Sequence, residues 1–246
     1  MAELRVVPLP TSVEVLPGDD VTTVLLEAIA DAGIELVDGD VVCVASKVVA
    51  KAEGAFVPLP AGLDPDDARR LLAREQARRV VADTPHVLVV ETRHGFVCAM
   101  AGIDTSNLPG DDVALLLPAD PDASASALRQ RLLEATGADV GVVVTDTFGR
   151  PWRLGQTDVA LGVAGLVALR DDRGTADRTG RELQVTQVAV ADQVAAAADL
   201  VRGKADGTPF VLLRGLTVAG DGTGRDLLRP AAQDVFRTGP GGDPEP

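Results

Sequence analysis

Residues 142–165 read VVVTDTFGRPWRLGQTDVALGVAG and contain the sharpest change of character in the chain. The valine run predicts a short buried strand over 140–144, followed by a dense polar loop. Asp146 and Thr147 stand where that strand is expected to end. Carboxylate and hydroxyl oxygens are ligands that suit hard cations such as magnesium and manganese. The alternative interpretation is that the pair forms a helix N-cap or an Asx turn.

Further strands and helices are expected on both sides of this run. Apolar spacing and turn residues predict helices over 20–32, 64–80, 122–136 and 187–202, and strands over 41–45, 87–91, 96–101 and 210–214. Asp64 and Asp122 are the expected N-caps of two helices, and Gly203 is the expected end of the last one. Because strands and helices alternate irregularly, we expect a mixed α/β (α+β-like) fold rather than a regular doubly wound sheet.

No linker divides the sequence clearly. We expect one unit over 1–238, with a subdomain edge near 104–120, and a disordered tail over 239–246. The two cysteines, Cys43 and Cys98, stand in apolar stretches and are expected to be buried, reduced thiols.

Composition limits the classes of partner. The 246 residues are 46% hydrophobic but only 2% aromatic, which predicts an aliphatic core. The net charge of −14 argues against nucleic acid or an anionic membrane surface as a partner. No stretch approaches the roughly 20 apolar residues that span a bilayer, and the N-terminus lacks the apolar segment of a secretory signal. We expect a cytoplasmic protein that acts on small molecules.

Two other segments place polar residues directly after a predicted strand. Asp104 follows the strand 96–101, with Asn107 three residues later, and a second acid could share a cation with the first. Ser46 follows the strand 41–45, and Lys47 and Lys51 share one face if this segment is helical. Lysine near a strand end commonly binds phosphate. A capping turn and a solvated basic face, respectively, are the alternatives.

The segment 202–209, RGKADGTP, joins the last predicted helix to the strand 210–214. Its glycines would allow backbone N–H groups to approach a phosphate, although it is no P-loop, and a helix C-cap is the alternative. Six arginines cluster nearby in sequence, at 150, 153, 170, 173, 178 and 181. They fit a polyanionic ligand or, alternatively, ion pairs with neighbouring acids.

Together these segments closely resemble the coenzyme F420:L-glutamate ligases, also called F420-0:gamma-glutamyl ligases. The matching runs follow one another in family order: DGDVVCVASKVVAKAEG (38–54), VVETRHGFVCAMAGIDTSN (89–107), DPDASASALRQRLLEATG (120–137), 142–165 as quoted above, LRDDRGTADRTGRELQVTQVAVADQVAAAADLVRGKADGTP (169–209) and LLRGL (212–216). Six long matches in order are far more specific than any short motif.

The resemblance implies a GTP-dependent amide ligase with a mixed α/β fold and an intertwined homodimer. Such enzymes add L-glutamate to the lactyl-phosphate carboxylate of a deazaflavin precursor, F420-0, and extend a gamma-linked tail. The implied route is activation of the carboxylate as an acyl phosphate and attack by the glutamate amine, with release of GDP and phosphate. Two divalent cations, manganese or magnesium, are implied, together with a potassium ion. A different carboxylate acceptor and a non-catalytic nucleotide-binding homologue are the alternatives.

Residue roles follow from the same resemblance. Asp104 and Asp146 correspond to ligands of the first divalent cation, and Thr147 lies near the second. The implied GTP contacts are Ser46, Lys51, Asn107, Arg202, Gly203, Lys204, Ala205, Asp206, Gly207, Thr208 and Pro209. Many relatives carry Glu or Gln at the position of Lys204, where the side chain can reach the second metal. Here Lys204 would face phosphate instead, and Asp206 is a candidate replacement as the metal ligand. Arg150 and Arg153 join Asp146 as catalytic candidates; these two arginines are chosen for their charge rather than from the resemblance, and they are expected to contact the acyl phosphate or the phosphodiester of the precursor.

Overall fold

A five-stranded mixed sheet forms the centre of the protein. The structure is a computed structural model and describes residues 3–108, 110, 112–203, 206–234 and 236. In spatial order the strands are β1 (Arg5–Leu9), β12 (Phe210–Arg214), β2 (Val41–Ala45), β8 (Gly141–Arg150) and β9 (Arg153–Ala164). Only β2 and β8 run parallel, whereas the other neighbouring pairs are antiparallel. The predicted mixed α/β class is confirmed.

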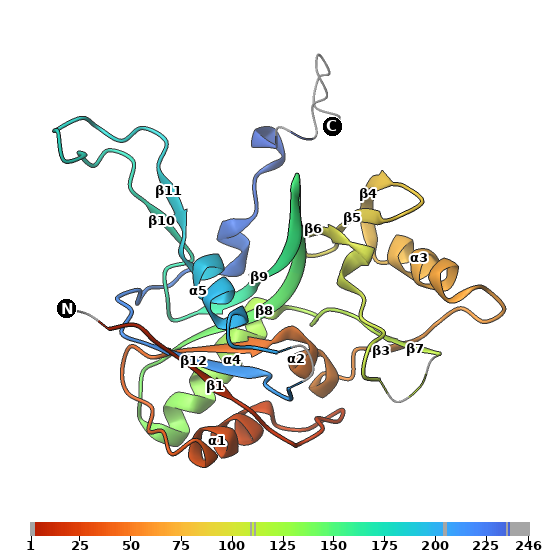
Figure 1. Cartoon of the computed structure of the whole chain (residues 1–246), viewed down its shortest axis with the longest axis horizontal. Helices are drawn as coiled ribbons and strands as arrows, with labels where there is room; N and C mark the ends of the chain where they lie inside the picture. Colours follow the sequence, from red (N-terminus) through yellow and green to blue (C-terminus); the bar gives the residue numbers. More distant parts are fainter. Residues whose placement is uncertain (1–2, 109, 111, 204–205, 235, 237–246) are drawn as a thin grey trace.

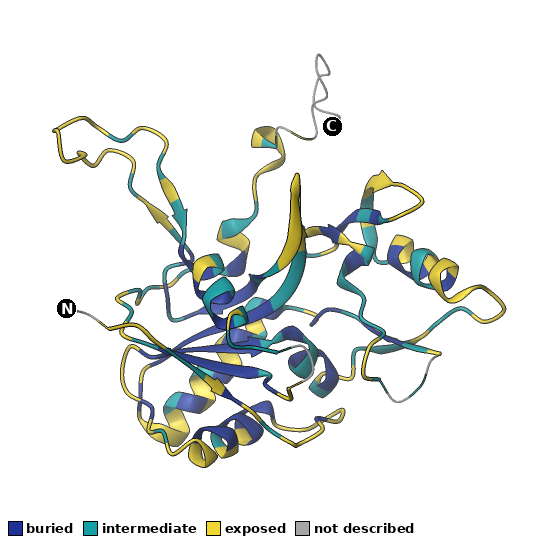
Figure 2. Cartoon of the chain, viewed as in Figure 1, coloured by how far each residue is buried: buried dark blue, intermediate teal, exposed yellow. Residues whose placement is uncertain are grey.

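Helices cover both faces of this sheet (Figure 1). The apolar run of β2 explains why, because its successive side chains point to opposite faces. Val42 and Val44 pack in one core with residues of α1 (Val21–Asp31) and α4 (Pro121–Thr136). Val41 and Cys43 pack in a second core with residues of α5 (Val190–Asp199). Strands β2 and β12 and the first half of β8 are buried, whereas β8 becomes exposed toward Arg150 (Figure 2).

Smaller elements extend to one side of the central sheet (Figure 1). A three-stranded antiparallel sheet contains β4 (Ala77–Asp83), β5 (Leu88–Thr92) and β6 (Val97–Ala99). Helix α3 (Pro65–Glu75) and the 3₁₀ turn η1 (Met100–Gly102) pack against β5. The short strands β3 (Phe56–Pro58) and β7 (Val113–Leu115) pair with each other, and α2 (Ser46–Ala52) follows β2 directly.

The C-terminal half adds an arm and two short turns. Strands β10 (Leu169–Asp171) and β11 (Gln187–Ala189) form the base of an exposed arm that projects from the body (Figures 1 and 2). The 3₁₀ turns η2 (Gly224–Leu227) and η3 (Ala231–Gln233) follow β12. The tail predicted over 239–246 lies outside the described residues. Within the described part of the chain, no helix has the length and apolar character needed to cross a membrane.

The main correction concerns the strand that contains Asp146. It does not end at residue 144 but continues to Arg150, because β9 pairs with it as far as Arg153 and makes the predicted polar loop part of a hairpin. A register shift between Val144 and Thr145 marks the point where the buried half of the hairpin becomes polar. Asp146 and Thr147 are therefore strand residues, and the N-cap and Asx-turn alternatives are wrong.

Other boundaries also differ from the sequence prediction. The helix expected over 64–80 ends at Glu75, since the next residues pair with β5 as β4. The helix expected over 187–202 is shorter at both ends, since Gln187–Ala189 pairs with β10 and the helix ends at Asp199. The strand expected over 96–101 gives way to η1 after Ala99. The strands predicted at 41–45 and 210–214 are confirmed.

The structure confirms one of the two predicted helix N-caps and corrects the other. Asp64 caps α3 by accepting from the N–H of Asp66, as predicted. Helix α4 is capped by Asp120 rather than Asp122. The Asp122 carboxylate instead accepts from the backbone N–H groups of Val163 and Gly224, at 2.9 and 2.6 Å, and ties α4 to β9 and η2. Both cysteines are buried and free, as predicted.

Candidate active site

The parallel pairing of β2 and β8 brings two polar strand positions together. Ala45 lies beside Thr145 at the end of the pair, so Ser46 and Asp146 come next at one edge of the sheet. A pocket of about 830 Å³ opens there. The segments that form its wall are far apart in the sequence: 11–15, 45–51, 99–107, 145–149 and 199–209 all contribute.

Most of the residues predicted from the sequence lie in this wall. They are Ser46, Lys51, Asp104, Asn107, Asp146, Thr147, Arg202, Gly203, Gly207, Thr208 and Pro209. Lys204 and Ala205 lie outside the described residues. Asp206 is exposed and folds back over Gly203, where an added Cβ would lie 1.8 Å from its Oδ2. Gly203 is not the helix cap, because α5 ends at Asp199 and is capped by Leu200.

Arg150 and Arg153 lie at the exposed end of the β8–β9 hairpin, outside the described pocket wall. The guanidinium of Arg150 donates to the backbone carbonyls of Leu154 and Gly155 and so holds its own turn. Of the other clustered arginines, Arg170 and Arg173 pair with acids two residues away. The structure therefore does not bring the arginine cluster to the pocket.

Asp104 enters the pocket wall from the segment after η1. Met100 and Ala101 both have positive φ angles, 52° and 57°, in the turn that leads to it. Its carboxylate pairs with Lys47, with 2.6 Å between Oδ2 and Nζ, and accepts from the N–H and hydroxyl of Ser106 at 2.7 Å each. Burial raises the pKa of Asp104, but these contacts outweigh it and the pKa lies below its ordinary value.

Asp146 has the opposite electrostatic balance. Burial raises its pKa to about 7, and the neighbouring carboxylates of Asp158 and Asp104 add to the rise, against hydrogen bonds from the backbone of Thr147 and the hydroxyl of Ser46. Two nearby acids and too few donors leave this carboxylate short of positive charge. A cation placed between Asp104 and Asp146 would relieve that deficit.

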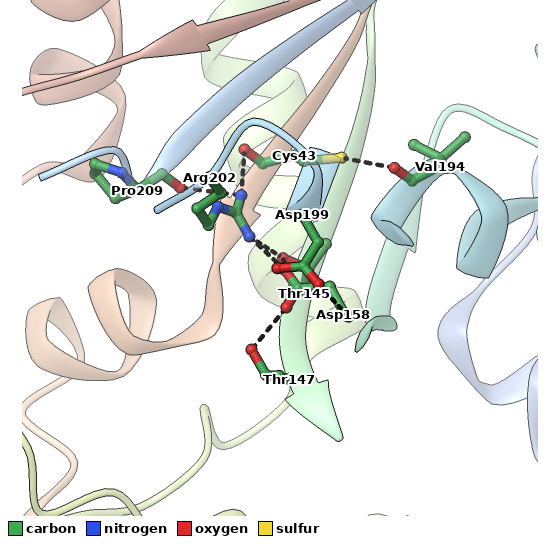
Figure 3. A network of polar contacts seen from close by, with 8 residues as sticks. All are labelled: Cys43, Thr145, Thr147, Asp158, Val194, Asp199, Arg202 and Pro209. Atoms are coloured by element: carbon green, nitrogen blue, oxygen red, sulfur yellow. Dashed lines mark hydrogen bonds and ion pairs between the residues drawn. The ribbon is translucent and has the colours of Figure 1, made fainter. Parts of the chain in front are cut away.

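Asp158 on β9 is the centre of a buried network (Figure 3). Its carboxylate accepts from the hydroxyls of Thr145, at 3.0 Å, and Thr147, at 2.7 Å. It also pairs with Arg202, with 2.6 Å between Oδ2 and Nη1, and its side chain is 2% exposed. Because the hydroxyl of Thr147 donates to Asp158, the network fixes the orientation of this hydroxyl in the pocket wall.

Arg202 fastens the segment that leads to β12. Besides Asp158, it donates to the hydroxyl of Thr145 at 2.6 Å and reaches the carbonyls of Cys43 and Pro209 at 3.4 and 3.3 Å (Figure 3). Further along, the carbonyl of Gly207 accepts from the N–H of Thr11 at 2.8 Å. Both terminal nitrogens of Arg202 are thus bound to the protein itself.

Helix α2 supplies the lysines. Lys51 is buried, with its side chain 8% exposed, and contacts the carboxylate of Glu14 and the carbonyl of Asn107. Lys47 is one helical turn earlier and pairs with Asp104. The solvated basic face considered as an alternative is wrong for both lysines.

A sequence model of the F420-0:gamma-glutamyl ligase family matches residues 11–215. The chain belongs to this family. It is similar to three proteins named coenzyme F420:L-glutamate ligase. That of Methanopyrus kandleri is 43% identical, over 95% of this chain and 98% of its own length. Those of Methanothermobacter thermautotrophicus and Haloarcula marismortui are 42% and 44% identical, over 89% and 91% of this chain and 93% and 92% of their own lengths.

The pocket of this F420-0:gamma-glutamyl ligase family member offers a limited set of donors to a metal. Among the residues described, no group of three or more His, Cys, Asp or Glu side chains could hold an ion. Asp104, Asp146 and the hydroxyl of Thr147 nevertheless line one wall. Two carboxylates and a hydroxyl fit a magnesium or manganese ion that completes its shell with water and substrate phosphates.

Sequence reasoning about this family member missed Asp158 and Glu14, and it named Lys47 only as a candidate phosphate contact. All three residues line the pocket and each forms an ion pair there. Asp158 stands within the polar stretch after the valine run. It is two residues from Gln156, and polar residues at this spacing lie on one face of a strand, which would have indicated β9. Nothing in the local sequence around Glu14 points to Lys51, which is 37 residues away.

Proposed function

We propose that this protein is a GTP-dependent ligase that joins L-glutamate to the carboxylate of coenzyme F420-0 and extends the gamma-linked tail. The observation that carries the proposal is the convergence of Asp104, Asp146, Thr147 and Lys51 on one pocket in a chain of this family. The names of the relatives support the acceptor and the amino acid.

The nucleotide is proposed to lie against α2 and the segment 202–209. Ser46, Lys51 and Asn107 line the pocket, and so do Gly207, Thr208 and Pro209. The lysine supplies charge for the phosphates, and the glycine-containing backbone allows close approach. In this arrangement GTP would replace Glu14, which is 72% exposed at its side chain, as the partner of Lys51.

Asp104, Asp146 and Thr147 would hold divalent manganese or magnesium, and a potassium ion is a further expectation from the family. When bound, such ions neutralise the charge of the phosphates during phosphoryl transfer. The contribution of the chain is to hold the three oxygens on one wall. Asp158 orients the hydroxyl of Thr147, which donates to it. Ser46 orients the carboxylate of Asp146 through a side-chain hydrogen bond.

The proposed reaction has two steps. An oxygen of the precursor carboxylate attacks the γ-phosphorus of GTP, and GDP leaves with the electrons of the broken P–O bond. The amine of glutamate then attacks the acyl carbon, loses a proton, and inorganic phosphate leaves. A pocket of about 830 Å³ is within the volume range of ligand sites, about 300–1,000 Å³, and would hold the reacting ends of the substrates.

A direct test uses the purified chain with GTP, manganese, F420-0 and L-glutamate, and mass spectrometry of the product. Product heavier than F420-0 by one or more glutamyl units, with stoichiometric GDP, is expected. If addition of the precursor causes no release of GDP, the proposal is refuted. GDP release with another acid would favour a different acceptor, and lack of nucleotide binding would favour a non-catalytic homologue.

The assembly is proposed to be a homodimer. Exposed apolar side chains support this: Trp152 and Leu154 at the hairpin end are 80% and 96% exposed. Light scattering coupled to gel filtration should give about twice the chain mass of 25.4 kDa.

A further inference from the structure

The described wall of the pocket contains five carboxylates and four cationic side chains. Three of the four cations are already paired with a carboxylate of the same wall: Lys47 with Asp104, Lys51 with Glu14, and Arg202 with Asp158. The fourth is Arg69. Its role is not explained by the metal and nucleotide contacts proposed above.

Arg69 is held by weak contacts only. The acid beside it in the described structure is Asp66, one helical turn earlier on α3, at 3.6 Å from Nη1 and 77% exposed at its side chain. The Nε–H group of Arg69 is buried without a hydrogen-bond partner among the described residues. A buried donor without a partner is costly, so this position favours an incoming acceptor.

Two further arginines of the same helix, unlike Arg69, form close ion pairs within the protein. Arg70 and Arg74 both pair with Asp83 on β4, and Arg70 also donates to the carbonyl of Thr84. They join α3 to the hairpin behind it. Arg69 alone of the three lies in the pocket wall. The helix thus uses two arginines for its own packing and leaves the third for the pocket.

Arg69 lies on an element that supplies none of the proposed nucleotide contacts. Helix α3 packs against η1, and Met100, Gly102 and Ile103 of that region also line the pocket. The proposed nucleotide contacts come instead from α2, from Asn107 and from the segment 202–209. Asp104 follows η1 in the chain and lines the same pocket.

We infer that Arg69 binds an oxyanion of the substrates that are joined, either a carboxylate of the amino acid or the phosphodiester of the acid substrate. A guanidinium presents two parallel N–H groups that match either anion, and such paired hydrogen bonds fix orientation as well as affinity. The inference rests on the proposed function. It adds a residue that orients the acceptor or the amine against the activated carboxylate.

The test compares Arg69→Met and Arg69→Lys with Arg74→Met, a control on the same helix whose side chain pairs with Asp83 outside the pocket. KM is measured in turn for GTP, F420-0 and L-glutamate with the other two at saturation. Binding of each substrate to the manganese-loaded protein is followed separately by calorimetry. Arg69→Met should raise KM and the dissociation constant at least tenfold for glutamate or for F420-0. Both values for GTP should stay within twofold of those of the wild type. Arg69→Lys should recover only part of the loss.

The two arms identify the source of the oxyanion, since a change for glutamate indicates a carboxylate and a change for F420-0 indicates the acid substrate. Unchanged values for both would overturn the inference, as would an equal loss for all three substrates or a loss for GTP alone. If the wild-type chain forms no product, the proposed function fails. If the wild type ligates and Arg69→Met retains every KM, only the inference fails.

Discussion

Lys47 and Asp104 form an ion pair across the pocket, with 2.6 Å between Nζ and Oδ2. The pair joins α2 to the segment after η1, and the same ammonium contacts the carbonyl and hydroxyl of Ser106 at 2.9 Å each. A lysine therefore neutralises the carboxylate that is proposed to bind a divalent cation. The cation and the ammonium compete for the same oxygen.

This competition predicts the behaviour of Lys47→Met. Without nucleotide, the variant should bind manganese about 3- to 10-fold more tightly, because a partly exposed ion pair of roughly 1 kcal/mol no longer has to be broken. Electron paramagnetic resonance of free manganese measures this directly. Lys51→Met is the matched control, since its ammonium pairs with Glu14, and its affinity should be unchanged. Weaker binding by Lys47→Met would contradict the prediction.

Asp146→Asn should reduce ligation by at least about 100-fold and leave the fold intact. A neutral amide cannot replace the charge of a carboxylate at a cation that is worth several kcal/mol to phosphoryl transfer. Product formation by mass spectrometry and the circular dichroism spectrum are the two measurements. Asp171→Asn, a change on the exposed arm, should retain full activity. Retained ligation in Asp146→Asn would remove Asp146 from the metal site.

The raised pKa of Asp146, about 7, also predicts how metal-free stability depends on pH. The folded protein keeps a proton on this carboxyl up to near neutral pH, whereas the unfolded chain releases it near pH 4. The contribution of the protonated Asp146 carboxyl to the free energy of unfolding is therefore fully present below about pH 4 and is lost as the pH rises to about 7.

Asp146→Asn should remove this dependence. With a chelator at pH 8 the variant should be more stable than the wild type by about 1–3 kcal/mol, and at pH 5 the gap should shrink. Urea denaturation at both pH values measures the difference. Manganese binding to the wild type should weaken below pH 7, since the proton competes for the carboxylate. A pH-independent gap between variant and wild type would show that burial does not raise this pKa.

Asp158→Asn should destabilise the protein by about 3–5 kcal/mol, because it leaves the guanidinium of Arg202 without its buried partner. It also weakens the acceptor that holds the hydroxyl of Thr147. Urea denaturation gives the free energy of unfolding. Arg173→Met, which breaks an exposed pair with Asp171, is the control and should leave the free energy of unfolding nearly unchanged. Equal effects of the two changes would contradict the buried network.

Much of the site could be predicted because its residues follow apolar strands. The runs at 41–45 and 142–144 predict buried strands by composition, and the parallel pairing seen in the structure places the polar residues after them at one edge of the sheet. Ser46, Asp146 and Thr147 were found in this way. Lys47 was noticed only as a basic residue on a helix, because its partner Asp104 is 57 residues away in the sequence.

The sequence alone determined the mixed α/β class, the inner strands and the family, since long apolar runs and ordered motifs are local properties of the chain. The tertiary structure decided that β8 and β9 continue as a hairpin past Thr145, and that Asp158 meets both Thr147 and Arg202. It also decided that Arg150 holds its own turn while Arg69 lines the pocket. The reason is physical: strand length and the partner of a charge depend on pairing between distant segments, and sequence periodicity carries no information about which distant segment arrives.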